Sequence, residues 1–234
     1  MYYFASDIHL GAGDAATARA VERRFVAWLD DAARDAEAIF LVGDIFDFWF
    51  EYRRVVPKGF VRTLGKLAEL TDRGVRVVFF TGNHDMWVGD YLARECGLEI
   101  HTSPEVMTLS GKKVFIAHGD NMKIDGQPML KFLNRIFRSR TLRWLFSWGV
   151  HPDWTEPYTG SSEPHTEPLV EYAREYSRTH AVDLFVFGHM HFPRDCREGR
   201  LHVVNLGCWA ENPSYAVLDA AGELTLKMPG KTSV

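Results

Sequence analysis

Residues 75–85, with the sequence VRVVFFTGNHD, decide how the rest of the chain is interpreted. Valine and phenylalanine dominate residues 75–81, which is typical of a buried strand. The polar turn Gly82-Asn83-His84-Asp85 follows this run at once. In open α/β sheets, ligands collect outside the carboxyl ends of the strands, so a polar turn at that place is a candidate for chemistry.

Four other short polar motifs follow apolar runs in the same way. They are Asp7-Ile8-His9, Gly43-Asp44, His118-Gly119-Asp120 and Gly188-His189-Met190-His191. A sheet would bring all five turns to one edge, although they are far apart in the sequence. We expect the glycines to let the backbone turn abruptly after each strand, at positions 43, 82, 119 and 188.

Short runs rich in valine, isoleucine and phenylalanine alternate with longer helix-like segments, which indicates an α/β protein. Strands are expected at residues 2–6, 39–42, 75–81, 114–117, 184–187, 203–206 and 215–218. Helices are expected at residues 16–36, 60–73, 88–96 and 167–179. Strand-like runs follow one another directly between residues 201 and 228, so antiparallel pairing is expected there.

One segment interrupts this alternation. Residues 129–148 are basic and aromatic and predict helix, whereas residues 152–168 are rich in Pro, Thr, Ser and Gly and predict a loop. We therefore expect a main domain of residues 1–120 and 166–234, with a helical cap inserted at 121–165. The helix has two interpretations: an apolar face packed on the domain, or an amphipathic surface that receives acyl chains and contacts anionic lipid.

The composition is ordinary for a soluble globular protein, because 46% of the 234 residues are hydrophobic and 25% are charged. The net charge of -4 gives no general attraction to nucleic acid, and no nucleic-acid partner is expected. The N-terminus lacks the pattern of a signal peptide, and the three widely spaced cysteines suit a reducing cytosol, so we expect a cytoplasmic protein. The sequence does not define an oligomeric state.

The side chains in the five motifs are those that bind divalent metal ions. Carboxylate, imidazole and amide groups suit Mn, Fe, Zn or Mg, and no cysteine stands in the motifs, so a soft thiolate site is excluded. An Asp-x-His or His-x-His pair on an extended strand would point both side chains to the same side. Two ions bridged by a shared carboxylate would use the whole set: Asp7, His9, Asp44, Asn83, His118, His189 and His191.

The motifs DIH, GDIFD, GNHD, HGD and GHMH resemble the pattern of the calcineurin-like metallophosphoesterase superfamily over residues 7–191. The resemblance implies a four-layer α/β/β/α double-sheet sandwich, here with the helical cap insertion. It also implies two divalent ions, with manganese expected first and iron, zinc or magnesium as alternatives. Asp44 would bridge them, one ion being held by Asp7, His9, Asp44 and His191 and the other by Asp44, Asn83, His118 and His189.

His84 adjoins a ligand but is not one by position, and we expect it to donate a hydrogen bond or a proton to the phosphoryl or leaving oxygen. Asp85 and Asp120 are expected to orient ligands or the neighbouring loop. Asp47 is expected only to cap the turn after Asp44. Each of these three acidic residues also has a purely structural interpretation.

The stretch GDIFDFW at residues 43–49, the chain length and the position of the cap resemble the UDP-2,3-diacylglucosamine diphosphatase family. Members of that family hydrolyse a pyrophosphate in lipid A synthesis of Gram-negative bacteria, which gives lipid X and UMP. The resemblance implies a lipid-linked nucleotide-sugar substrate and peripheral contact with the inner membrane. Substrate contacts are expected from Asn83, Asp120, Lys131, Phe132, Arg135, Ile136 and Phe137.

Histidine stands at position 84, as in the wider superfamily, where the best-known diphosphatases have arginine. A phosphoprotein phosphatase, a nuclease and a cyclic-nucleotide phosphodiesterase are therefore alternatives of the same chemistry. The cap favours the lipid substrate over them, because simple phosphatases do not need an apolar lid. A third hypothesis is a binding scaffold without activity, but such proteins usually lose ligands that this chain keeps.

Overall fold

The computed structural model describes residues 1–120 and 167–229 of the chain. The strands are β1 Tyr2–Ala5, β2 Ala38–Val42, β3 Arg76–Phe80, β4 Glu99–His101, β5 Glu105–Leu109, β6 Lys112–Ala117, β7 Leu184–Phe187, β8 Arg194–Glu198, β9 Leu201–Asn205, β10 Tyr215–Leu218 and β11 Leu224–Lys227. The helices are α1 Ala15–Ala32, α2 Val61–Asp72, α3 Tyr91–Cys96 and α6 Glu167–Tyr176.

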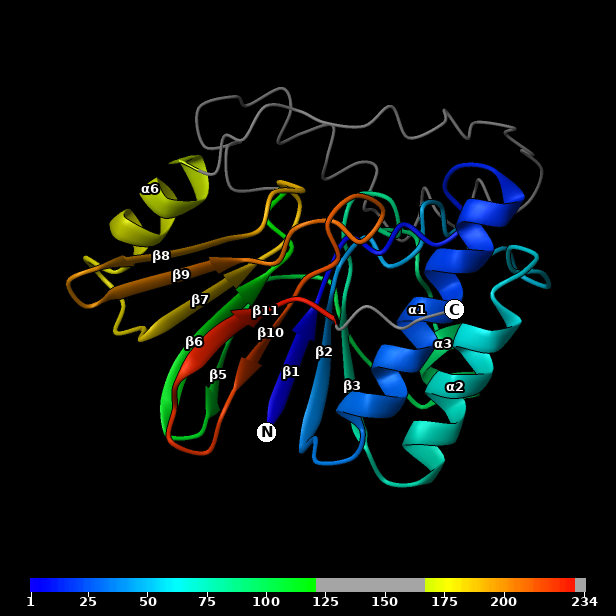
Figure 1. Ribbon diagram of the computed structural model, residues 1–234, viewed down its shortest axis with the longest axis horizontal. Coiled ribbons are helices and arrows are strands. Elements are labelled where there is room, and N and C mark those ends of the chain that lie inside the picture. The colour runs from blue at the N-terminus through cyan, green and yellow to red at the C-terminus, as the bar shows by residue number, and fades with distance from the viewer. Residues whose placement is uncertain (121–166, 230–234) are drawn as a thin grey trace.

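Two sheets lie face to face, with helices on their outer faces (Figure 1). The first sheet has the order β11-β10-β1-β2-β3-β4, and β1 to β4 run parallel. The second has the order β5-β6-β7-β9-β8, in which β6, β7 and β9 run parallel. The four-layer α/β/β/α sandwich expected from the sequence is confirmed.

The alternation of side chains along the strands produces these layers. In β2, Ile39 and Leu41 face helices α1 and α2, whereas Phe40 and Val42 face the second sheet. In β7, Val186 faces the first sheet, and Phe187 packs with α6 residues on the other side. The central strands are therefore apolar on both faces, as parallel strands covered on both sides must be.

The elements expected from the sequence are present with boundaries shifted by a few residues. Helix α1 ends at Ala32 rather than 36, and α3 begins at Tyr91 rather than 88. Antiparallel pairing within residues 201–228 is confirmed for β10 with β11, whereas β9 pairs with β7 and β8 of the second sheet. Strands β4, β5 and β8 were not expected. Each is a short strand at the edge of its sheet, and its polar residues give only a weak pattern of apolar residues.

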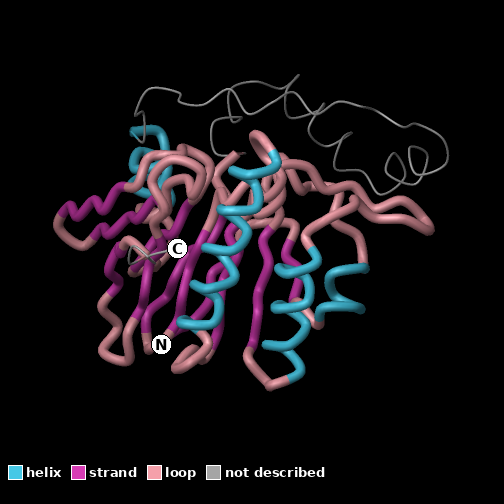
Figure 2. Tube along the Cα trace, turned by 45° about the vertical axis from the view of Figure 1, so that its right-hand side comes forward, coloured by secondary structure: helices cyan, strands magenta, loops and turns pink. Residues whose placement is uncertain are grey.

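The cap expected at 121–165 lies entirely outside the described residues, which resume at residue 167. Among the residues described, no helix is both long enough and apolar enough to cross a bilayer. The loops after β1, β2, β3, β6, β7 and β9 gather at one end of both sheets, as the turned view shows (Figure 2).

Candidate functional site

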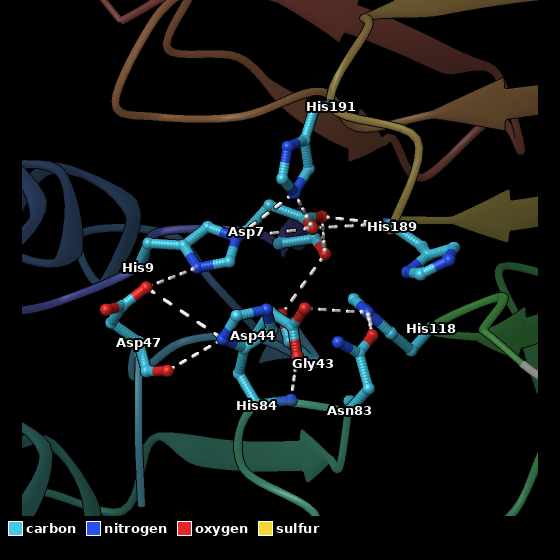
Figure 3. A network of polar contacts seen from close by, with 12 residues as sticks. Asp7, His9, Gly43, Asp44, Asp47, Asn83, His84, His118, His189 and His191 are labelled. Atoms are coloured by element: carbon cyan, nitrogen blue, oxygen red, sulfur yellow. Dashed lines mark hydrogen bonds and ion pairs between the residues drawn. The ribbon is translucent and has the colours of Figure 1, made fainter. Parts of the chain in front are cut away.

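The five polar motifs meet where the carboxyl ends of the two sheets converge (Figure 3). The first sheet contributes the turns after β1, β2 and β3, and the second contributes those after β6 and β7. The structure thus brings together all seven candidate ligands expected from the sequence: Asp7, His9, Asp44, Asn83, His118, His189 and His191.

One group of ligand atoms forms around Asp7. Its Oδ1 lies 3.2 Å from His191 Nε2 and 3.9 Å from His9 Nε2. The two imidazole Nε2 atoms are 3.1 Å apart. Two nitrogens and one oxygen therefore converge on a common point.

A second group forms around His118. Its Nε2 lies 3.1 Å from Asp44 Oδ2 and 3.3 Å from Asn83 Oδ1. His189 also offers a ligand atom within 4.8 Å of those of Asp44 and His118. Asp44 belongs equally to a set with Asp7 and His9, so its carboxylate links the two groups.

These separations fit divalent ions. Bonds of roughly 2.0–2.2 Å to nitrogen and oxygen, at tetrahedral or octahedral angles, separate neighbouring ligand atoms by about 3.0–3.5 Å. Most of the ligand-atom separations given above fall in or near this range, from 3.1 Å for His118 with Asp44 to 3.3 Å for His118 with Asn83. The donor set matches the two ions that the sequence analysis expected.

The backbone at the ligands differs from the expectation of an extended strand. Asp7, His9, Asp44, His189 and His191 all have positive φ, between 48° and 69°. Non-glycine residues rarely adopt this left-handed conformation, and it concentrates at functional sites. The side chains of the Asp-x-His and His-x-His pairs do converge, but strained turns beyond the strand ends direct them, and the alternation of a strand does not.

The glycines also act in two different ways. Gly43 and Gly119 have positive φ, as expected of sharp turns. Gly82 and Gly188 do not, and the expectation is wrong for them. A Cβ at Gly82 would collide with the Asp44 carboxylate, and one at Gly188 with Ser6 and Asp7. These two glycines make room for the carboxylates.

Neighbouring groups fix the tautomers of two histidines. His118 Nδ1 donates to the Val42 carbonyl at 3.0 Å, which leaves Nε2 for an ion. His9 Nδ1 donates to the Asp47 carboxylate at 3.2 Å, with the same result. Asp47 therefore contacts a candidate ligand directly, which the sequence analysis missed. Its position three residues after Asp44 was the sequence feature that could have indicated this contact.

His84 lies beside the ligands with its side chain 36% exposed. Its Nδ1 donates to the Asp47 carbonyl at 2.7 Å, so Nε2 is the nitrogen left to exchange a proton. Its backbone N–H donates to Asp44 Oδ1 at 2.9 Å. The loop that carries His84 is thus fixed to the central carboxylate.

Asp85 is fully buried and connects two of the loops. Its carboxylate accepts from the backbone N–H of Gly82 at 2.7 Å and of Ile45 at 2.8 Å. Burial, aided by the charge of Asp44, raises the pKa of Asp85 to about 7. Asp120 acts at longer range, because its charge raises the pKa of His118.

Burial and opposite charges compete at the ligands. Burial alone would raise the pKa of Asp44, but His118 and His9 hold it below its ordinary value. Burial alone would lower the pKa of His118, but Asp44 and Asp7 hold it well above its ordinary value. Burial lowers the pKa of His189, and the charge of His118 lowers it further. A cation at the centre of the cluster is therefore favoured, whether proton or metal.

The sequence analysis excluded a thiolate because no cysteine stands in the five motifs, yet one cysteine lies beside two candidate ligands. Cys208 is fully buried, and its Sγ lies within 4.8 Å of ligand nitrogens of His9 and His191. It follows β9 through Gly207, just as the other motifs follow their strands, and that signal was available in the sequence. The expected substrate residues Lys131, Phe132, Arg135, Ile136 and Phe137 lie outside the described residues.

Comparison with known proteins is consistent with this geometry. Residues 2–193 match the family model described as calcineurin-like phosphoesterase. A UDP-2,3-diacylglucosamine hydrolase of Porphyromonas gingivalis is 40% identical, over 93% of this chain and 93% of its own. Hydrolases of the same name from Edwardsiella ictaluri and Haemophilus influenzae are each 26% identical, over 97% and 94% of this chain and 91% and 96% of their own.

Among solved structures, an archaeal phosphodiesterase aligns with 97% of this chain and 98% of its own, with a TM-score of 0.51. The two sequences are 14% identical, so this similarity concerns the fold alone.

Proposed function

The chain belongs to the calcineurin-like phosphoesterase family, and from that premise we propose that it hydrolyses the pyrophosphate of UDP-2,3-diacylglucosamine to lipid X and UMP. It is a metal-dependent hydrolase, as its family and its relatives are. The observation that carries the proposal is the pair of ligand groups joined by Asp44, in a chain 40% identical to a hydrolase of that name.

We assign one ion to Asp7, His9, Asp44 and His191, and the other to Asp44, Asn83, His118 and His189. When bound, two divalent ions supply Lewis-acid stabilisation of the phosphoryl charge and a water nucleophile of lowered pKa. For these oxygen and nitrogen ligands, manganese is our first expectation.

The protein's own residues supply the remaining chemistry. His84 is partly exposed beside Asp44, and its Nε2 is placed to give a proton or hydrogen bond to the phosphoryl or leaving oxygen. Val42 and Asp47 hold the imidazoles of His118 and His9 in one tautomer. Asp85 keeps the loops after β2 and β3 in register, so that Asp44 and Asn83 face the same point.

The lipid part of the substrate requires an apolar surface near the ions. We propose that residues 121–165 supply it as a cap, with Lys131, Phe132, Arg135, Ile136 and Phe137 in contact with substrate and Asp120 and Asn83 nearer the phosphates. Because the acyl chains partition into membrane, the protein would work in the cytoplasm at the inner membrane of a Gram-negative bacterium.

The test is a hydrolysis assay of chelator-treated protein, before and after addition of manganese, iron, zinc or magnesium. UDP-2,3-diacylglucosamine, bis(p-nitrophenyl) phosphate and a phosphopeptide are compared, and UMP and lipid X are detected by mass spectrometry. We expect metal-dependent release of both products, with the lipid substrate preferred. Faster turnover of the phosphopeptide or of the generic diester would assign the site to another substrate.

A single variant separates the lipid specificity from the chemistry. Phe137→Asp should abolish turnover of UDP-2,3-diacylglucosamine and leave bis(p-nitrophenyl) phosphate hydrolysis nearly unchanged. Equal loss on both substrates would mean that residue 137 supports the fold and does not contact the acyl chains.

A further inference from the structure

Cys208 lies in a turn that ends beside the candidate ligands. Its Sγ is within 4.8 Å of ligand nitrogens of His9 and His191, and those two Nε2 atoms are 3.1 Å apart. The thiol is fully buried, and the His9 side chain is as well. Two imidazoles and a thiol therefore share one small volume at the carboxyl ends of β1, β7 and β9.

The turn is fixed to the site through the main chain. The N–H of Trp209 donates to the Asp7 carbonyl at 2.9 Å, and the N–H of Leu206 donates to the Phe187 carbonyl at 2.8 Å. Cys208 is thus held between the strand ends that carry Asp7 and His189.

Cys208 also differs from an ordinary core cysteine. Buried cysteines usually behave as small apolar side chains. Its neighbour Trp209 belongs to the core between the first sheet and its helices, but Cys208 belongs to none of the three apolar clusters of the described residues. The thiol is buried beside imidazoles that could hold a metal ion.

We infer that Cys208 is a further ligand, through its sulfur, of the ion assigned to Asp7, His9 and His191. This inference rests on the proposed function only for the existence of that ion. Metal–sulfur bonds of about 2.3 Å and metal–nitrogen bonds of about 2.0–2.1 Å place S and N roughly 3.1 Å apart at octahedral angles and roughly 3.6 Å apart at tetrahedral angles. Both values lie inside the 4.8 Å within which the three ligand atoms are found. Coordination replaces the S–H bond by a metal–sulfur bond and releases the proton to solvent.

The consequence is that the two metal positions differ in kind. Thiolate favours zinc, iron and cobalt over magnesium and manganese, whereas carboxylate, amide and imidazole accept all of them. The position with Cys208 therefore selects a softer ion than the position with Asn83 and His118. Mixed occupancy follows when both kinds of metal are supplied.

The experiment uses the full chain loaded with Co²⁺ after chelation. Cobalt bound to thiolate gives a near-ultraviolet sulfur-to-metal charge-transfer band, which oxygen and nitrogen ligands do not give. We expect the band in the wild type and in Cys196→Ser, a cysteine on β8, and its loss in Cys208→Ser and Cys208→Ala. In competition between zinc and manganese, Cys208→Ala should bind zinc about 10-fold less selectively, as measured by metal analysis.

Each result decides the inference. An unchanged band in a Cys208→Ala protein of native circular dichroism would overturn it, as would a wild type that binds two cobalt ions without the band. If both Cys208 variants misfold, X-ray absorption at the cobalt edge of the loaded Cys196→Ser protein decides. A cobalt–sulfur distance of about 2.3 Å supports the inference, and a spectrum explained by nitrogen and oxygen ligands alone would overturn it. Turnover of UDP-2,3-diacylglucosamine is measured separately, so a wrong substrate leaves the band and its interpretation intact.

Discussion

The two sheets contribute different chemistry to the site. Every candidate carboxylate and amide ligand comes from the first sheet, after β1, β2 and β3, together with His9, whereas the second sheet contributes imidazoles after β6 and β7 and places the Cys208 thiol after β9. Close polar contacts cross between the sheets, such as Asp7 with His191 at 3.2 Å and Asp44 with His118 at 3.1 Å. Acidic groups of one sheet are matched by basic groups of the other.

This difference shows why neither sheet could hold the site alone. Asp7 and Asp44 lie in one buried group, and two carboxylates brought together without counter-charge would raise each other's pKa. His118 of the second sheet supplies most of that charge to Asp44, with a smaller share from His9 of the first sheet, and a metal ion supplies more of it. The site therefore depends on the packing of the apolar core between the sheets.

Asp44→Asn should have the largest effect, because Asp44 is shared by the two ligand groups. We expect at least one ion per chain to be lost and kcat to fall by roughly 10³-fold or more. Metal analysis and turnover measure both. Asp72→Asn, at the exposed end of α2, is the matched control and should change neither. An Asp44→Asn protein that still binds two ions would show that the Asp44 carboxylate is not needed to bridge them.

His84→Ala should have the next largest effect and a different signature. His84 donates from its backbone to Asp44 but is not among the ligands, so metal content should stay the same while kcat falls roughly 10²–10⁴-fold. Exposed His180 provides the control substitution to alanine. Full turnover of His84→Ala on the natural substrate would rule out an acid role.

Much of this arrangement could be predicted from sequence, because the first sheet is built from parallel strands separated by helices. Buried runs such as residues 75–81 identify strands, and the polar residue after each run identifies its carboxyl end. The four layers and the convergence of the motifs follow from that regularity.

The parts that were missed depend on contacts that have no local signal. The left-handed φ of Asp7 and His9 is imposed by the surrounding turns, and a residue such as aspartate or histidine gives no sign of it. The role of Asp47 depends on the position of His9, 38 residues away. Cys208 was overlooked although the strand expected at residues 203–206 ends just before it, because a single cysteine does not match the polar motifs at the other strand ends.

Asp47→Ala should have a smaller effect that is confined to one ligand group. Without the acceptor for His9 Nδ1, the ring is no longer held in the tautomer that leaves Nε2 free for metal. We expect metal affinity to fall about 10–100-fold at that position, measured by chelator titration. Asp47→Asn keeps an acceptor oxygen and should lose less. Equal loss in both variants would point to the charge of Asp47 rather than to its hydrogen bond.

The smallest expected effect is on thermal stability of chelator-treated protein as the pH changes. His118 has a pKa well above its ordinary 6.5, so its contribution to stability is complete below that value and is lost as the pH rises through the raised pKa. The pKa of Asp85 is raised from 3.8 to about 7, so stability also declines as the pH rises across that interval.

Both groups therefore lower Tm as the pH rises from about 4 to beyond neutral pH, at roughly 2–4 °C per kcal/mol of stability lost. Metal-loaded protein should show a weaker decline, because the ion replaces the His118 proton as the counter-charge to Asp44. His118→Gln should lose the part of the decline above neutral pH and keep the part due to Asp85. Differential scanning fluorimetry of the three samples measures these slopes. A Tm of the chelated wild type that increases over this pH range would mean that protonated His118 does not hold the two sheets together at the site.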